Sequence, residues 1–448
     1  MVSSIKNKQA EQSVQLNGHE VPADALHHMT TFMDGNSLRN FVRAGRAFFN
    51  VVQQRSDLSE PSLCTQLPNI SVDNYSITFC DDEHNACSIY PYGYNEFRCI
   101  SEHKITSLSG SKTHQVWLTD AGSVYVKKDT GEFLITGFSL DKDERINRVY
   151  AGNSVSFALS TKNKLYGWGA NTSGELAQGN TIDSAFPLEI VIPNKEIREI
   201  AVGSSFVLAL TTDNQIYAWG ANRDGQLGLE SKQESYTTPQ EIIFFKDMNI
   251  RAIYAQGNHA FVIANNQVFA FGGSRNHQLG LLLADANEMK MDPEIRESYY
   301  CVYRRPMSVS FPDADFIVML AAGHSFTLAL TLNGELYGWG KNILGRSISS
   351  VTPVILDFFN NKKVISAFAN GDSYLTLTSE EELNQFNKSV LNRKSVYRIY
   401  FNQQEVVNEQ LQKTLLKSSR VIREYALHKA YDALNLDDEK QSSYCTIL

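Results

Sequence analysis

One phrase of about a dozen residues recurs along this chain, and a repeated unit constrains a fold more than any single motif does. Its first copy reads Leu-Tyr-Gly-Trp-Gly-Ala-Asn-Thr-Ser-Gly-Glu-Leu, and every copy keeps an aromatic residue followed, two places later, by Trp-Gly or Phe-Gly. The copies occupy residues 165–176, 216–227, 268–279 and 336–345. A second phrase, with a glycine near its start and Ala-Leu at its end, precedes three of them at 151–159, 202–210 and 322–330.

Each unit has the pattern of a β-hairpin. Residues 206–210 form a short apolar run and residues 216–219 alternate, so both segments are predicted to be strands. Thr-Thr-Asp-Asn at 211–214 supplies the turn between them. A small antiparallel sheet of this kind cannot bury its own faces, whereas several packed radially can. The repeat therefore predicts a β-propeller.

The repeat glycines set the size of one propeller blade. They fall at positions 110, 152, 203, 257, 323 and 371, which gives spacings of 42, 51, 54, 66 and 48 residues. We expect a mainly β fold, with a propeller of six to seven blades over residues 68–378. Residues 88–95 resemble only the end of a unit and residues 369–377 only its beginning. The two half-units are therefore predicted to share one blade and so close the ring.

These phrases resemble the regulator of chromosome condensation repeat, most closely at residues 203–228. The founding member of that family is a nucleotide exchange factor for the small GTPase Ran, and many relatives are interaction platforms. The resemblance implies that the loops after the repeat glycines bind a GTPase, with His259, His324 and Asp372 as the candidate residues. For His324, hydrogen bonding within the blade turn is the favoured alternative.

The sequence shows no conventional catalytic site. It contains no paired nucleophile and base, no phosphate-binding Gly-x-x-x-x-Gly-Lys and no metal cluster, so neither a cofactor nor hydrolase or transferase activity is predicted. The six cysteines form no Cys-x-x-Cys pair. A net charge of −8 argues against nucleic acid as the main partner. Nucleotide exchange, which needs only a protein surface, is the most that we expect.

The N-terminal region is predicted to hold a second module. Residues 1–18 are polar and are expected to be flexible, and residues 19–55 have apolar residues at helical spacing. This segment resembles an F-box, the motif that docks a substrate receptor on the Skp–cullin ubiquitin ligase. The matching residues are Pro22, Leu26, Phe32, Leu38 and Phe48. A helical segment packed on the propeller is the open alternative.

The C-terminal region lacks glycine and proline from residue 372 onward. Apolar residues at roughly helical spacing predict a helical extension over 379–440. The tail, 441–448, ends in Cys445-Thr-Ile-Leu448, a prenylation box whose terminal leucine favours a covalent geranylgeranyl group on Cys445. A host prenyltransferase would be the partner for that step. No transmembrane span or signal peptide is predicted. Because the prenyl group would anchor the chain, we expect a protein at the cytosolic face of membranes.

The combination of F-box, propeller and prenylation box resembles a translocated bacterial effector that acts in a host cell. The sequence leaves three functions open. The first is a membrane-tethered exchange factor for Ran or a related small GTPase. The second is an F-box substrate receptor of a ubiquitin ligase, and the third is a tethered scaffold without activity.

Overall fold

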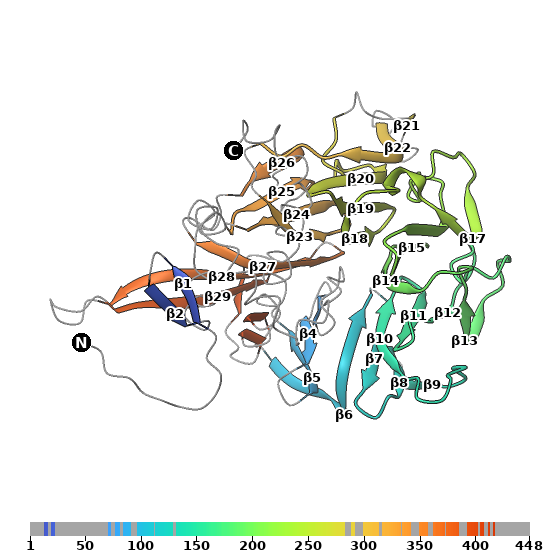
Figure 1. Ribbon diagram of the computed structural model, residues 1–448, viewed down its shortest axis with the longest axis horizontal. Coiled ribbons are helices and arrows are strands. Elements are labelled where there is room, and N and C mark those ends of the chain that lie inside the picture. Colours follow the sequence, from blue (N-terminus) through green and yellow to red (C-terminus); the bar gives the residue numbers. More distant parts are fainter. Residues whose placement is uncertain are drawn as a thin grey trace. The chain divides into compact units, whose positions relative to one another are not determined.

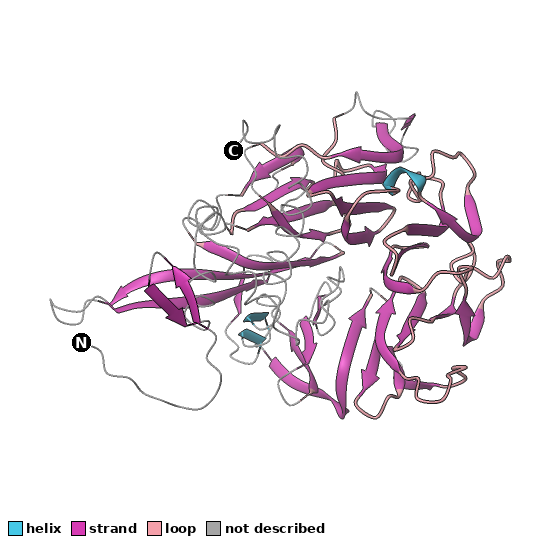
Figure 2. Cartoon of the chain, viewed as in Figure 1, coloured by secondary structure: helices cyan, strands magenta, loops and turns pink. Residues whose placement is uncertain are grey.

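The computed structural model divides the chain into two units, Met1–Pro61 and Ser62–Leu448. The residues that it describes are 13–16, 19–22, 70–72, 77–80, 84–90, 96–111, 113–128, 131–282, 288–291, 299–312, 316–332, 334–341, 349–356, 362–371, 373–384, 392–401, 404–406, 411–412 and 415–416. Strands account for nearly all of the regular secondary structure in these ranges (Figures 1 and 2). None of the helices in the described ranges is long and apolar enough to span a membrane.

The first unit contains an antiparallel hairpin where the sequence predicted a flexible segment and then the start of a helix. Strand β1 (Ser13–Leu16) pairs with β2 (His19–Pro22). Pro22, which was placed in the predicted F-box-like helical segment, instead ends a strand. The other residues of the predicted F-box, Leu26, Phe32, Leu38 and Phe48, lie outside the described residues.

The second unit is a succession of antiparallel sheets, which confirms the predicted propeller. The first sheet has seven strands in sequence order: β3 (Ile70–Val72), β4 (Ile77–Cys80), β5 (Asn85–Tyr90), β6 (Glu96–Gly110), β7 (Gln115–Thr119), β8 (Val124–Lys128) and β9 (Gly131–Ile135). The long strand β6 pairs with β5 through its first part and with β7 through its last part. It therefore makes one continuous sheet from two hairpin systems.

Five further sheets of four or five strands are separate blades. Their strands, blade by blade, are β10 (Ile146–Ala151), β11 (Val155–Ser160), β12 (Leu165–Gly169) and β13 (Ser184–Ile190); β14 (Ile197–Val202), β15 (Phe206–Thr211), β16 (Ile216–Ala221) and β17 (Ser235–Glu241); β18 (Ile250–Gln256), β19 (His259–Ala264), β20 (Gln267–Ser274), β21 (Glu288–Met291) and β22 (Tyr299–Ser308); β23 (Ile317–Ala322), β24 (Phe326–Thr331), β25 (Leu336–Gly340) and β26 (Ser350–Ile355); β27 (Lys363–Asn370), β28 (Ser373–Asn384), β29 (Asn392–Phe401) and β30 (Gln404–Val406). A short 3-10 helix, η1 (Ile243–Phe245), follows β17.

The inner strands of these sheets form a closed ring. Contacts run from β3 through β6, β10, β14, β18, β23 and β27, and β27 returns to β3. The second strands β11, β15, β19 and β24 are buried along their whole length. Since sheets pack on both of their faces, these strands are apolar runs and do not alternate.

The last blade corrects two predictions. Strands β27 to β30 form one sheet from consecutive chain, so the half-units at 88–95 and 369–377 do not share a blade. Residues 379–384 and 392–401, where the helical extension was predicted to start, belong instead to the long hairpin of β28 and β29, and the sheet reaches Val406. Leu411 and Leu415 are helical and are buried with Phe79 and Leu375, where the last sheet meets the first. The ring is therefore closed by side-chain packing.

The glycine of Trp-Gly is required by a close approach of two backbones. Gly220 has φ of +95°, and a Cβ at that position would lie 2.5 Å from the carbonyl oxygen of Ser205. The pairing of β16 with β17 also shifts register there, as in a β-bulge. Gly169, Gly272 and Gly340 repeat both features in their own blades.

The rest of the phrase fastens one blade to the next. Trp219 donates its Nε1–H to the carbonyl of Glu175 in the preceding blade over 2.7 Å, and Trp339 donates likewise to Gln278. The leucine that ends each of the first three phrases is fully buried, and Leu227 packs with residues of two neighbouring blades. The signature is therefore an inter-blade clasp.

We predict that Leu227→Ala lowers the free energy of unfolding by about 2–5 kcal/mol, because it leaves a cavity between two blades. Chemical denaturation monitored by tryptophan fluorescence measures the change. Ile182→Ala is the matched control, since Ile182 lies on the same kind of loop but is 72 % exposed. Equal effects of the two substitutions would contradict the clasp.

Candidate functional site

Two kinds of loop lie at the same end of every complete blade. The turn after the repeat glycine accepts a backbone hydrogen bond from the residue that follows Trp-Gly, as from Ala221 N to Ser205 O over 2.8 Å and from Lys341 N to Ser325 O over 2.8 Å. The same bond links Ala170 to Ser154, and in the third separate blade it comes from Gly273, one residue after Phe-Gly, to Asn258. We call the surface that these turns and loops form the glycine-turn face.

Hydrogen bonds between blades join the turns of this face. Ser204 N donates to Gly257 O over 2.9 Å, and His324 N donates to Gly371 O. Gln256 Nε2 donates to Asn370 Oδ1 over 2.9 Å, which links the third and fifth of the separate blades. These hydrogen bonds hold the turns of the glycine-turn face in fixed positions relative to one another.

His259, one of the three predicted GTPase-binding residues, lies inside the protein. It is 1 % exposed and lies in β19, where it pairs with Gly272 of β20. Phe206 and Phe326 occupy the same position in their blades, opposite the glycine of Trp-Gly. Among the described residues, neither ring nitrogen has a hydrogen-bond partner, and the ring contacts Phe261 edge-on. Burial, followed by the nearby His324, lowers the pKa of His259 to about 3. Its imidazole is thus neutral at physiological pH and is not offered to a partner.

His324 is the predicted residue that the structure does expose. It follows Gly323 in the turn between β23 and β24. A Cβ at Gly257 would lie 3.4 Å from His324 Nδ1 and 3.7 Å from His259 Nδ1, so the two imidazoles flank this glycine. Asp372, the third predicted residue, lies outside the described residues.

The structure adds polar groups that the sequence analysis did not select. Asn258 is exposed beside Gly257 and donates its Nδ2–H to Asp224 Oδ2 over 2.9 Å. Arg223 is also exposed and pairs with Glu234 at 3.0 Å. Arg223 and Asp224 are the two variable residues of Asn-x-x-Gly. The sequence could have identified them as candidate surface residues from their variable positions in the repeat, because a rigid scaffold presents its variable loop positions to solvent.

Glu175 departs from the repeat beneath the same face. Gln226 and Gln278 occupy its position in the next two blades, and each caps a backbone N–H of its loop through Oε1. Glu175 does the same for Ser173 N over 2.8 Å, although it is 3 % exposed. Burial raises the pKa of its carboxyl group above the ordinary value. This blade therefore holds a buried acid where the others hold an amide.

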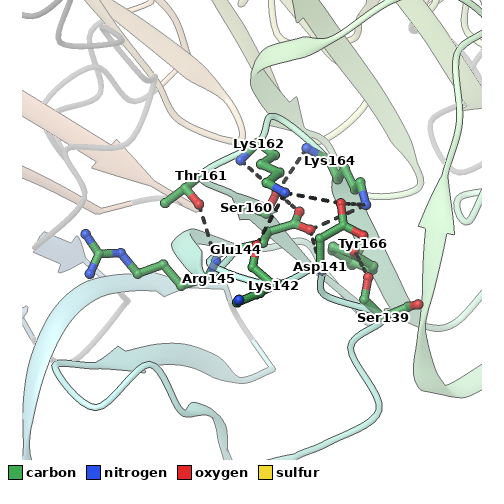
Figure 3. Close-up of polar contacts among 10 residues, drawn as sticks. All are labelled: Ser139, Asp141, Lys142, Glu144, Arg145, Ser160, Thr161, Lys162, Lys164 and Tyr166. Atoms are coloured by element: carbon green, nitrogen blue, oxygen red, sulfur yellow. Dashed lines mark hydrogen bonds and ion pairs between the residues drawn. The ribbon is translucent and has the colours of Figure 1, made fainter.

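A charged cluster at the opposite end of the blades is structural (Figure 3). Glu144 is buried and accepts hydrogen bonds from Ser160 Oγ over 2.5 Å and from Asp141 N over 2.8 Å. Burial acts to raise its pKa, but these bonds and the nearby Lys164 outweigh burial and hold the pKa below its ordinary value. Lys162 and Lys164 both pair with Asp141. The cluster holds the segment after β9 against the hairpin of β11 and β12.

Among the described residues, no three His, Cys, Asp or Glu side chains gather as a metal site.

We predict that His259 makes the fold acid-labile. An imidazole whose pKa is lowered on folding contributes stability that is lost as pH falls from about 6.5 toward 3, because the unfolded chain binds the proton first. The loss is about 2 kcal/mol at pH 5. His259→Phe, which restores the residue of the neighbouring blades, should remove it. Denaturant unfolding at pH 7 and pH 5 measures the difference, and an unchanged difference in the variant would contradict the assignment.

Comparisons with known proteins agree with this architecture. The model of the regulator of chromosome condensation (RCC1) repeat matches residues 162–210, 213–263 and 265–330, and a second model of the repeat matches 197–226 and 317–346. The ultraviolet-B receptor UVR8 of Arabidopsis thaliana is 27 % identical over 276 residues, which are 52 % of this chain and 62 % of UVR8.

Two further proteins are informative. The probable E3 ubiquitin-protein ligase HERC6 of Homo sapiens is 28 % identical over 46 % of this chain, and the match covers 19 % of HERC6. The crystal structure of Prp20p from Saccharomyces cerevisiae was described together with the binding of Prp20p to Gsp1p and histones. Its similarity to this protein covers 77 % of this chain and 89 % of the Prp20p chain. Its TM-score is 0.53 at 17 % identity, which indicates a shared fold. Residues 162–346 of this chain therefore match RCC1 repeats almost throughout, and the second unit shares its fold with Prp20p.

Proposed function

We propose that this protein binds a small GTPase, Ran or a relative, through the glycine-turn face of a propeller of six or seven blades, and that it promotes guanine-nucleotide exchange. The observation that carries the proposal is the set of turns on that face that hydrogen bonds between blades hold together, with His324, Asn258 and Arg223 exposed on it. The similarity in fold to Prp20p, whose binding to Gsp1p is described, supports the same class of partner.

Exchange requires differential binding and no nucleophile. A protein that binds the nucleotide-free GTPase more tightly than the loaded one lowers nucleotide affinity by the same factor. A thousandfold effect needs about 4 kcal/mol of differential affinity. A rigid surface suits this task, since a surface that adapts to both states of the GTPase discriminates poorly between them.

We predict that His324→Ala slows stimulated nucleotide release about tenfold, the usual effect of losing a side chain at the centre of an interface. The measurement is release of a labelled guanine nucleotide from Ran, and from a panel of other small GTPases, at substoichiometric protein. Lys164→Ala, at the opposite end of the blades, is the matched control. Pro22→Ala and Leu26→Ala should also leave release unchanged.

A second proposal is that the chain is an F-box substrate receptor and that the propeller holds its target. The sequence similarity to HERC6, a probable ubiquitin ligase, favours this alternative. Absence of nucleotide release from every GTPase tested, together with capture of Skp by the wild type but not by Pro22→Ala or Leu26→Ala, would select it over exchange.

We further propose that Cys445 carries a geranylgeranyl group, added by a prenyltransferase of the host cell if the protein is a translocated effector. A single prenyl chain gives weak anchoring, so a membrane-bound partner would strengthen it. Cys445→Ser should move the protein from the membrane to the soluble fraction of a eukaryotic cell. Cys64→Ser is the control, and membrane retention of the Cys445 variant would contradict prenylation.

A further inference from the structure

The edge strand β9 lacks the protection that other blades give to their fourth strands. In three blades the outermost strand carries a proline and pairs with its neighbour through a register shift. These strands are β13 with Pro187, β17 with Pro239 and β26 with Pro353. In the blade of β18 to β22, the outermost strand is β21, which has only four residues. Prolines and bulges are devices that keep an edge strand from pairing with another chain. The last blade ends in β30, which has only three residues.

Strand β9 has neither device. Its sequence, Gly-Glu-Phe-Leu-Ile, contains no proline, and it pairs with β8 in unbroken register from Lys128 opposite Gly131 to Val124 opposite Ile135. It is the last strand of its sheet (Figure 1), and within the described residues no other strand pairs with its outer edge. Its outer backbone groups are therefore open to another strand.

Apolar side chains on both faces of β9 are exposed. Phe133 is 48 % exposed and Leu134 is 53 % exposed, and adjacent residues of a strand point to opposite faces. Ile135 is packed against the core between blades, so it holds the end of the strand in place. Exposed apolar residues on an unpaired edge are the features expected of a site for strand addition.

The apolar surface continues onto the next blade. Gly137 lies two residues beyond β9, and a Cβ at that position would be 3.9 Å from Cδ1 of Phe186. Phe186 is 66 % exposed on β13. A chain that paired with β9 would therefore meet further apolar surface at the rim.

The strand is held rigidly at both ends. Lys127 Nζ on β8 pairs with Glu132 Oε1 at 2.9 Å. After β9, the cluster of Figure 3 fixes Asp141 and Glu144 against the neighbouring blade, and Tyr166 OH donates to Ser139 O over 2.6 Å. A second strand would dock on an edge that is already formed, so little ordering entropy opposes binding.

We propose that β9 pairs antiparallel with β9 of a second copy of this chain, with Phe133 opposite Phe133 on the two-fold axis. In that register Gly131 faces Ile135, and Glu132, the strand's one charged residue, faces Leu134 and so avoids its own copy. The pairing is self-complementary, as an isologous interface must be. The central aromatic pair is among the favourable cross-strand pairs. This self-complementarity selects a second copy over an unrelated peptide.

The test replaces Phe133, which would lie on the two-fold axis, with residues of opposite charge in the full-length chain. Sedimentation velocity over a range of concentrations should show wild type approaching twice the monomer mass. Phe133→Lys and Phe133→Glu should each weaken association at least about tenfold, because like charges then face each other directly. An equimolar mixture of the two variants should restore the dimer. Such restoration also shows that both variants are folded.

Ile355→Lys and Ile355→Glu are the matched controls, since Ile355 is 50 % exposed on the proline-bearing strand β26. Both should dimerise as the wild type does. Phe133→Cys should in addition form a disulfide-linked dimer under mild oxidation, whereas Ile355→Cys should not. A wild type that stays monomeric at every concentration overturns the proposal, as does a mixture of the charged Phe133 variants that fails to associate.

Discussion

The interaction on which this structure depends is the clasp between neighbouring blades. A tryptophan of one blade donates to a backbone carbonyl in the loop of the blade before it, as Trp219 does to Glu175, and the leucine after that loop is buried between the two sheets. No blade can bury its own faces, so each is stable only while its neighbour supplies the other half of a core. The clasp also fixes the loops from which the glycine-turn face is built. Stability and the geometry of the candidate binding face therefore come from the same few residues of the repeat.

Departures from the repeat identify chemistry that the scaffold does not need. His259 replaces the phenylalanine of two other blades and brings an unpaired imidazole into the core beside the exposed His324. Glu175 replaces the glutamine of the next two blades and is a buried acid. Both substitutions lie under the glycine-turn face, and burial disfavours the charged form of each residue. A scaffold under selection for stability alone would retain the amide and the aromatic ring. The concentration of such departures near one face is the pattern expected where function opposes stability.

The sequence predicted the strands of the blades that carry the repeated phrases. It did not predict the structure of segments that lack these phrases. The glycine of Trp-Gly recurs in each copy of the repeat, and its physical cause is that a Cβ at Gly220 would lie 2.5 Å from the carbonyl oxygen of Ser205. The last blade was missed because β28 and β29 have neither a Trp-Gly phrase nor turn glycines, and apolar residues such as Val396, Ile399 and Tyr400 fit a helical period as well as a strand. The hairpin of β1 and β2 had a signal that was overlooked, since Asn17-Gly18 stands between the two strands in the sequence. The burial of His259 could have been inferred from its alignment with Phe206.

The same comparison among repeats explains why one rim differs from the others. A propeller leaves the outermost strand of every blade unpaired, so each copy of the repeat must prevent edge-to-edge association separately. Pro187, Pro239 and Pro353 do this at one equivalent place, and the β-bulge beside each proline reinforces it. The position that corresponds to these prolines in the earlier sheet is Glu132, which leaves β9 straight and regular. Loss of proline and bulge together removes two safeguards from a strand on which phenylalanine and leucine are exposed. Pairing with another strand covers such an edge, and self-pairing about Phe133 supplies this cover without burying an unpaired charge.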